Sequence, residues 1–81
     1  MRANNLLILG AGQYGRVVKE IAEDSGAFGE IACLDDKNSL AIGKFTDIEK
    51  FKGRFENAVV AIGNIALREK LINELKAAGY K

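Results

Sequence analysis

Three short apolar runs organise the chain, and a segment with helical features follows each of them. The pattern predicts strands over residues 5–9, 31–34 and 58–62. The apolar residues in these runs are continuous rather than alternating, which is typical of strands covered on both faces in a parallel sheet. The chain therefore predicts an α/β fold.

Two longer segments carry apolar residues at the intervals of an amphipathic helix that faces the sheet. The first is predicted to end at Gly26 and the second at Gly79. Asn64 suits the N-cap position before the second helix. A shorter helix is predicted over residues 47–52, because Thr46–Glu49 has the spacing of a capping box. The two apolar stripes are Tyr14, Val17, Val18, Ile21 and Ala22, and Leu67, Leu71, Ile72, Leu75 and Ala78.

The alternation of strands and helices predicts one domain over residues 1–81, with a Rossmann-like, three-layer α/β/α architecture. Right-handed crossovers place the three parallel strands in the order 2-1-3, with helices on both faces. The connections after the first and third strands leave the carboxyl edge of the sheet in opposite directions. Ligands bind at such a switch point, so a binding site is expected there.

Charge and composition exclude several classes of function. Twelve basic and eleven acidic residues give a formal charge of +1, so neither nucleic acid nor a membrane surface is expected as a partner. No run is long enough for a membrane span, and no secretory signal is evident. The lone Cys33 predicts a buried residue of a cytoplasmic protein. Because the chain has no histidine, we assign no catalytic residue, and no metal ligand either.

The run Gly10-Ala11-Gly12-Gln13-Tyr14-Gly15 lies between the first strand and the first helix. In this context Gly-x-Gly-x-x-Gly predicts a tight turn, a close approach of the ligand to the backbone, and close packing of the helix on the strand. The N–H groups at the start of the helix favour a phosphate or a diphosphate. The alternative is a turn that is needed only for packing.

Two further pairs of residues are predicted at the same edge. Asp35-Asp36 end the second strand, where a carboxylate can accept hydrogen bonds from a ribose or a base, although acidic residues are also common in turns. Gly63 allows close approach from the opposite wall, and Asn64 either caps its helix or contacts a ligand. Tyr14 and Arg68 are likewise either ligand contacts or ordinary packing and surface residues.

NAD or another adenine nucleotide is the alternative ligand, because an acidic residue about twenty positions after the glycines also fits the dinucleotide fingerprint. A dinucleotide site needs a second mononucleotide-binding half, and this chain provides one half. A self-contained dehydrogenase is therefore not expected, and a regulatory module that binds such a nucleotide is the second hypothesis.

The combination of motifs resembles the N-terminal domain of bacterial sugar acyltransferases, the family of the sialic-acid O-acetyltransferases and the bacillosamine-pathway acetyltransferase. The resemblance rests on Ile8–Gly15, Leu34–Asp36, Ala61–Asn64 and Leu67-Arg68, in order over nearly the whole chain. It implies a domain that binds a UDP-linked amino sugar. In this family, acetyl-CoA and the catalytic histidine belong to a following left-handed β-helix that forms trimers, and this chain is expected to lack it.

By similarity, Gly12, Gln13, Tyr14 and Gly15 would line the diphosphate and the sugar. Asp35 and Asp36 would meet the uridine, and Gly63 and Asn64 would form the opposite wall. Many members have histidine in place of Tyr14, which leaves the sugar contact at this position open. The chain is expected to bind the substrate without a cofactor of its own and not to transfer an acetyl group by itself.

The third strand carries neither a charge nor a proline to protect its outer edge. In longer family members another strand would cover this edge. The chain is therefore expected to form a weak homodimer through residues 58–62.

Overall fold

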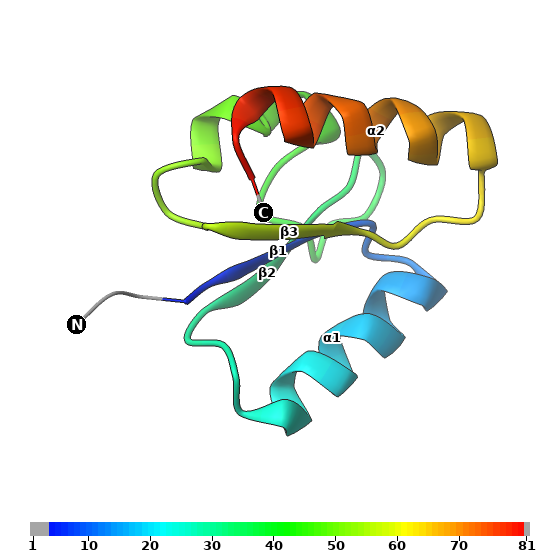
Figure 1. Cartoon of the computed structure of the whole chain (residues 1–81). Coiled ribbons are helices and arrows are strands. Elements are labelled where there is room, and N and C mark those ends of the chain that lie inside the picture. The colour runs from blue at the N-terminus through cyan, green and yellow to red at the C-terminus, as the bar shows by residue number, and fades with distance from the viewer. Residues whose placement is uncertain (1–3, 81) are drawn as a thin grey trace.

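A parallel sheet of three strands forms the centre of the computed structural model, which describes residues 4–80 (Figure 1). Residues 1–3 and 81 of the predicted domain lie outside this range. The strands are β1 (Leu6–Leu9), β2 (Ile31–Leu34) and β3 (Asn57–Val60), in the order β2-β1-β3. All pairs are parallel, with Leu6 opposite Ile31 on one side and Asn57 on the other. The predicted strand order is confirmed.

Helices cover both faces of the sheet. On one face lies α1 (Gln13–Ser25), and on the other lie α2 (Ile65–Ala78) and two short 3-10 helices, η1 (Phe45–Asp47) and η2 (Glu49–Phe51) (Figure 1). Both α-helices begin at the carboxyl edge of the sheet, on the right in Figure 1. Neither α-helix of residues 4–80 is long and apolar enough to cross a membrane. The layers are those of the predicted α/β/α class.

The central strand β1 supplies side chains to two cores, because successive residues of a strand point to opposite faces. Leu7 and Leu9 pack on the side of α2, and Leu6 and Ile8 pack on the side of α1. Of the stripe predicted for α2, Leu71, Leu75 and Ala78 are buried in the core on this side and Leu67 packs against it, whereas Ile72 is half-buried outside it. The other buried residues of the α2-side core are Ala32, Leu34, Ile48, Phe51, Phe55, Leu71, Leu75, Ala78 and Tyr80.

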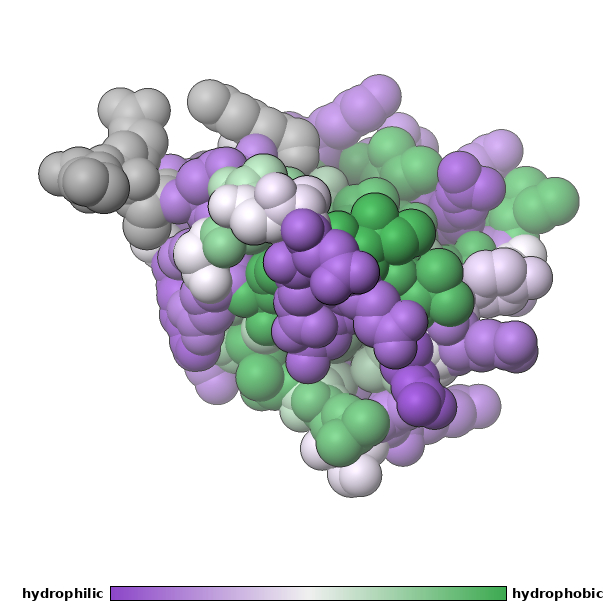
Figure 2. Space-filling view, turned by 90° about the horizontal axis from the view of Figure 1, so that it is seen from below, coloured by the Kyte–Doolittle hydropathy of each residue, from purple (hydrophilic) through white to green (hydrophobic). Residues whose placement is uncertain are grey.

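The stripe predicted for α1 does not face the sheet as a whole. Tyr14, Val17 and Ile21 are 66%, 51% and 65% exposed, and the buried residues of the helix are Gly15 and Ala22. Because α1 approaches the sheet at these two small residues, the larger side chains lie beside this contact, and Tyr14 and Val17 line open space next to the end of β3. Figure 2 accordingly shows hydrophobic residues among hydrophilic ones on the face that carries α1.

Two other expectations need correction. The helix predicted over residues 47–52 is replaced by η1 and η2, and the Asp47 carboxylate accepts a hydrogen bond from Lys44 N (2.9 Å) in place of the expected cap. Ile48 and Phe51, three residues apart, both reach the core, which fits 3-10 spacing. The third strand ends at Val60 and is only partly covered, whereas β2, at the other edge of the sheet, is buried beside the loop whose Gly43 pairs with Leu34.

Side-chain hydrogen bonds and an ion pair connect the chain segments at the amino edge of the sheet. The Asn5 amide accepts a hydrogen bond from Glu30 N (2.8 Å) and donates one to Arg54 O (2.8 Å). Asn57 donates to the side chain of Asn4 (2.6 Å), and the Arg54 guanidinium pairs with the Glu30 carboxylate. The segments that enter the three strands are thus tied to one another at this edge.

Candidate functional site

Two of the three glycines after β1 are required by backbone packing. Gly10 has a φ of +125°, and a Cβ at this position would lie 2.5 Å from the carbonyl oxygen of Ala61. At Gly15, a Cβ would overlap the carbonyl oxygen of Gly10. These contacts confirm the predicted tight turn and the close approach of the helix to the strand.

Gly12, by contrast, is not required by packing. Its backbone is extended with a φ of −80°, and nothing lies within 4 Å of the position that a Cβ would take. Gly12 is the N-cap of α1, and among the described residues no side chain accepts a hydrogen bond from the first turn of this helix. The first backbone bond of the helix joins Arg16 N to Gly12 O (3.0 Å), and the N–H groups before it have no partner within the helix. Gly12, Gln13 and Tyr14 are exposed at the carboxyl edge, whereas Gly15 is buried against Gly10.

The N-terminus of α2 lies at the same edge and is capped by its own chain. Asn64 Oδ1 accepts a hydrogen bond from Leu67 N (3.0 Å), and Asn64 O accepts one from Arg68 N (2.9 Å). The interpretation of Asn64 as an N-cap is therefore confirmed. Gly63, which precedes it, is exposed.

Asp35 connects the loops at this edge. One of its carboxylate oxygens accepts a hydrogen bond from Ala11 N (2.9 Å), and the other accepts from Lys37 N (2.9 Å) and Asn38 N (3.3 Å). Partial burial raises the pKa of the Asp35 carboxyl, but the three backbone donors and the charge of Lys37 outweigh this and hold the pKa below its ordinary value. Both oxygens of Asp35 are thus engaged in holding the glycine loop and the loop after β2.

Asn38 is a loop contact that the sequence analysis did not single out. Its side-chain amide donates to Ala11 O (2.9 Å), so Asp35 and Asn38 together hold both polar groups of Ala11. The Asp-x-x-Asn spacing, with side chains that bond nearby backbone groups in turns, was the available signal. Asp36 is exposed and accepts a hydrogen bond from Phe45 N (2.9 Å).

An open groove of about 670 Å³ lies between the start of α1 and the end of β3, and we call it the α1–β3 groove. Gln13 and Tyr14 line it from α1, and Gly63 lines it from the connection after β3. A Cβ on Gly63 would lie 3.4 Å from the Tyr14 ring, so these two walls meet. Arg68 adds a cationic side chain to the lining. The structure thus brings four of the singled-out residues together beside the glycine loop.

Cys33 is buried, as predicted. Burial raises the pKa of its thiol, as do the charges of Asp35 and Glu23, whereas Lys19 opposes the shift. The thiol is therefore protonated at neutral pH and behaves as a small apolar group. Within residues 4–80, no cluster of three or more histidine, cysteine or acidic side chains is arranged to hold a metal ion.

Residues 5–75 match the family described as the PglD N-terminal domain. The match includes all three strands and most of α2. The chain belongs to this family. The resemblance seen in the glycine loop and in the motifs after β2 and β3 is therefore confirmed. Among curated proteins, no match was found.

Solved structures of acetyltransferases contain the same fold as this PglD-family chain. The acetyltransferase domain of PglB from Neisseria gonorrhoeae FA1090, in complex with acetyl coenzyme A, is 30% identical, with a TM-score of 0.88 over 99% of this chain and 42% of that chain. A mutant of GDP-perosamine N-acetyl transferase from Caulobacter crescentus, in complex with CoA and GDP-perosamine, is 22% identical, with a TM-score of 0.81 over 95% of this chain and 40% of that chain. The second likeness shows the fold alone. The chain spans about two fifths of the length of both proteins.

Proposed function

We propose that this PglD-family domain binds a nucleotide-linked sugar of the UDP-sugar class at the carboxyl edge of its sheet. The main support for this proposal is the N-terminus of α1, which has no side-chain cap. Its N-cap residue, Gly12, is a glycine that packing does not require. Free N–H groups at a helix N-terminus attract phosphate, and no acidic side chain lies in the first turn to oppose it. Family membership supports a nucleotide sugar as the source of that phosphate.

In this proposal the backbone N–H groups of Gly12 to Gly15 bind the diphosphate, and Gly10 shapes the turn that presents them. The sugar lies in the α1–β3 groove, between Tyr14 and Gly63. The Tyr14 ring is exposed at this position and gives an apolar surface with a hydroxyl, which suits a sugar.

The nucleoside lies toward the end of β2, where Asp36 is exposed. Asp35 contributes by holding the glycine loop, because both of its oxygens already accept backbone hydrogen bonds. Asn64 contributes by capping α2 behind the opposite wall.

The domain orients its ligand and does not itself carry out the proton transfer. In a longer acetyltransferase, expected to be a trimer, it would hold a sugar amine or hydroxyl for attack on the thioester of acetyl-CoA, which binds elsewhere in the enzyme. The chain has no histidine to act as the general base of that attack. Its contribution is therefore the position of the acceptor sugar.

Thermal unfolding in the presence of UDP-N-acetylglucosamine or NAD tests the proposal. A ligand at 100 times its Kd stabilises the folded state by about 2.7 kcal/mol, which raises the Tm of a small domain by roughly 10–20 °C. We expect this shift with the UDP-sugar and not with NAD. A shift with NAD alone would favour the adenine-nucleotide alternative, and no shift with either would reject nucleotide binding.

Two glycine variants separate ligand binding from folding. Gly12→Val places a side chain in the open space before α1 and is expected to abolish the shift while the protein stays folded. Gly53→Val is the matched control, because a Cβ at Gly53 also meets nothing within 4 Å but lies away from the proposed site. If Gly12→Val binds the UDP-sugar as tightly as the unaltered chain, the diphosphate does not bind at the start of α1 and its proposed position is wrong.

We also propose a weak homodimer through residues 58–62. β3 pairs only with β1 in the described sheet, and its residue Val59 is 38% exposed. A lysine on an edge strand opposes pairing with another strand. Sedimentation at high protein concentration is expected to show a dimer that Val59→Lys weakens, and a monomer throughout the concentration range would reject the proposal.

A further inference from the structure

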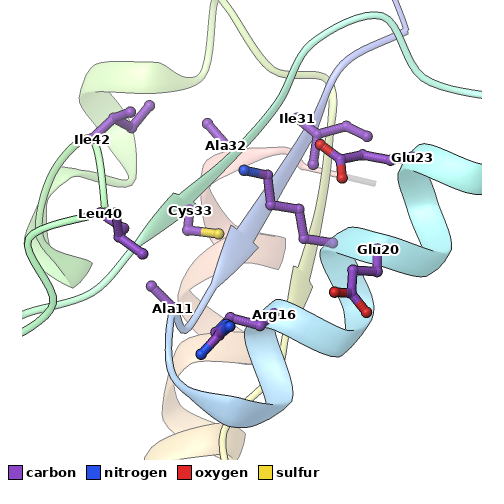
Figure 3. A pocket seen from close by; sticks show the side chains of 10 residues that line it. Ala11, Arg16, Glu20, Glu23, Ile31, Ala32, Cys33, Leu40 and Ile42 are labelled. Carbon is purple, nitrogen blue, oxygen red and sulfur yellow. The ribbon is translucent and has the colours of Figure 1, made fainter.

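The two edges of the sheet differ in what covers them. On the β2 side, the loop that follows the strand lies along its outer edge. Ile42 N donates a hydrogen bond to Cys33 O (2.9 Å), and Asp35 N donates one to Gly43 O (3.0 Å). Figure 3 shows this loop, in which Ile42 is labelled, beside β2. On the other side, β3 pairs only with β1 in the sheet of residues 4–80. β3 is therefore the open edge of the sheet.

Every second residue of β3 faces away from β1. Asn57 N and Ala61 N donate hydrogen bonds to carbonyl oxygens along the β1 segment, at 3.2 Å and 2.9 Å. Because the backbone groups of a strand alternate between its two sides, those of Ala58 and Val60 point outward. Such unpaired N–H and C=O groups can bind a further strand.

A groove of about 230 Å³ lies beside this edge, between β3 and α2, and we call it the β3–α2 groove. Ala58 and Val60 line it from the strand, and Ile72 lines it from the helix. Ile72 is half-buried and lies outside the core on this side of the sheet. An apolar surface is thus left uncovered next to unpaired backbone groups.

The two charged residues that line the β3–α2 groove, Arg68 and Lys76, are both cationic. Neither of them has an acidic partner, because the one ion pair within residues 4–80 joins Arg54 to Glu30. Ile72 lies between the two cations on the same flank of α2, since residues four apart are neighbours along a helix. The helix therefore presents a cation, an apolar side chain and a second cation in line.

This order matches the side-chain spacing of an extended segment. Residues four apart in an α-helix lie roughly 6 Å apart along its axis. Residues two apart in a strand point to the same face and lie roughly 6.7 Å apart. Because α2 runs back along β3 (Figure 1), a strand added to β3 would lie alongside this flank of the helix. Its alternate side chains would then meet Arg68, Ile72 and Lys76 in turn.

We propose that the β3–α2 groove binds an extended acidic segment of another protein, which adds a strand to β3. The backbone of the segment bonds the outward groups of Ala58 and Val60. Its side chains at alternate positions are acidic, apolar and acidic, so that they meet the two cations and Ile72 between them. This site does not rest on the proposed nucleotide-sugar site at the start of α1.

A second copy of the chain is a poorer match for the same groove. A twofold axis between two paired β3 strands would place Arg68 and Lys76 of both copies on the same face of the joined sheet, close to one another. Like charges repel, which keeps the proposed homodimer weak. An acidic segment gains an attraction in place of this repulsion.

Amide chemical shifts in NMR titrations with short peptides, blocked at both ends, test the proposal. The probe is Thr-Glu-Thr-Val-Thr-Glu-Thr, in which the glutamates and the valine share one face of a strand. We expect it to shift the amides of Ala58, Val60 and Ile72. The control Thr-Glu-Glu-Val-Thr-Thr-Thr has the same composition but places its glutamates on opposite faces, and it is expected to bind about tenfold more weakly.

Two results would overturn the proposal. One is equal binding of the two peptides, which would mean that the spacing of the charges is not recognised. The other is the absence of any shift in the β3 amides with either peptide. If these amides respond only to the concentration of the protein itself, the edge is occupied by a second copy instead.

A matched pair of charge reversals gives a second measurement. Lys76→Glu is expected to weaken binding of the first peptide about tenfold, because it replaces an attraction with a repulsion. Lys70→Glu makes the same change at an exposed position of α2 that does not line the groove, so it leaves the affinity unchanged. Equal affinities of the two variants would overturn the proposal.

A compensating change in the peptide tests the charge pairing directly. A peptide with lysine in place of one glutamate is expected to recover binding to the Lys76→Glu variant. Both positions of the lysine are tried, because the one that recovers binding reports the direction of the added strand. If neither peptide recovers binding, Lys76 does not pair with the segment and the proposal is overturned.

Discussion

The two α-helices begin at the same edge of the sheet, α1 after Gly12 and α2 after Gly63-Asn64, yet their first turns differ. The N-terminus of α2 is capped by the Asn64 side chain, whereas α1 starts at Gly12 without a side-chain cap. A cap of the Asn64 type stabilises a helix by about 1 kcal/mol. The chain uses this stabilisation at α2 and leaves the N–H groups of α1 available. Under the proposed function, the start of α2 serves the fold and the start of α1 serves a ligand.

The uncapped start of α1 is nevertheless held in place. Gly15 lies against the carbonyl of Gly10, and Asp35 binds the N–H of Ala11. The N–H groups are thus fixed in position before any ligand arrives, which lowers the entropy lost on binding. Five predictions test this comparison, in order of decreasing effect.

The largest effect is expected from Gly15→Ala. A Cβ here meets backbone atoms of Gly10 that cannot move aside without displacing β1, so the variant is expected to lose about 3 kcal/mol or more of unfolding free energy. Urea unfolding measures the change. Gly12→Ala is the matched control and is expected to stay within about 0.5 kcal/mol of the unaltered chain. Equal stability of the two variants would mean that α1 is not fixed through Gly15.

Asp35→Asn is expected to destabilise the fold by about 1–3 kcal/mol, because an amide has one acceptor oxygen for three backbone donors. The same variant is expected to weaken UDP-sugar binding, since the glycine loop loses its support. Urea unfolding and a binding titration measure the two effects. Normal stability with lost binding would instead assign Asp35 a direct ligand contact.

The pH dependence of stability gives an independent measure of Asp35. Because its pKa is lowered in the folded state, the carboxylate stabilises the fold above the ordinary value of 3.8, and this contribution is lost as the pH falls through the lower folded-state pKa. The stability difference between the unaltered chain and Asp35→Asn is therefore expected to narrow in acid. A constant difference from neutral pH into that range would contradict this account.

Asn64→Ala is expected to cost about 1 kcal/mol of unfolding free energy, through loss of the bond to Leu67 N. UDP-sugar affinity is expected to stay unchanged, because Asn64 serves α2. Thermal unfolding with and without the ligand measures both quantities. A fall in affinity beyond the loss of stability would show that Asn64 also contacts the ligand.

Gly12→Asn is expected to give the smallest change in stability. It tests most directly whether the missing cap of α1 matters for ligand binding. It provides α1 with the kind of cap that α2 has, which is expected to stabilise the ligand-free chain by a few tenths of a kcal/mol. The new side chain would compete with a phosphate for the same N–H groups, so nucleotide affinity is expected to fall. Unchanged affinity would separate ligand binding from the start of α1.

Much of the fold could be predicted from the sequence, because strand order follows from the sequence of elements and from handedness. The packing of α1 could not. The spacing of Tyr14, Val17 and Ile21 indicated a stripe that faces the sheet, but Gly15 and Ala22 make the closest contact. Hydrophobic periodicity does not reveal that a helix lies close enough to a strand to admit only small residues.

The candidate site could be predicted in outline, because the order of the strands determines which loops meet at the carboxyl edge. Sequence reasoning brought the glycine loop, Asp35-Asp36 and Gly63 to one edge, and the structure places them there. It could not show that both oxygens of Asp35 are engaged, since the bond to Ala11 joins residues that are far apart in the chain. Nor did it reveal that the segment after β2, interpreted only as a loop, pairs with the outer edge of this strand through Gly43.

The Asn5 side chain at the far edge of the sheet sets a limit on how the molecule can respond to a ligand. By bonding to Glu30 N and Arg54 O, it joins the two chain segments that return to the sheet. Any adjustment around a bound nucleotide is therefore confined to the connections at the opposite end, while the strand starts keep their spacing. In hydrogen exchange, ligand-dependent protection should accordingly concentrate in the glycine loop and in the loop after β2, with the amides near Asn5 exchanging at one rate in both states.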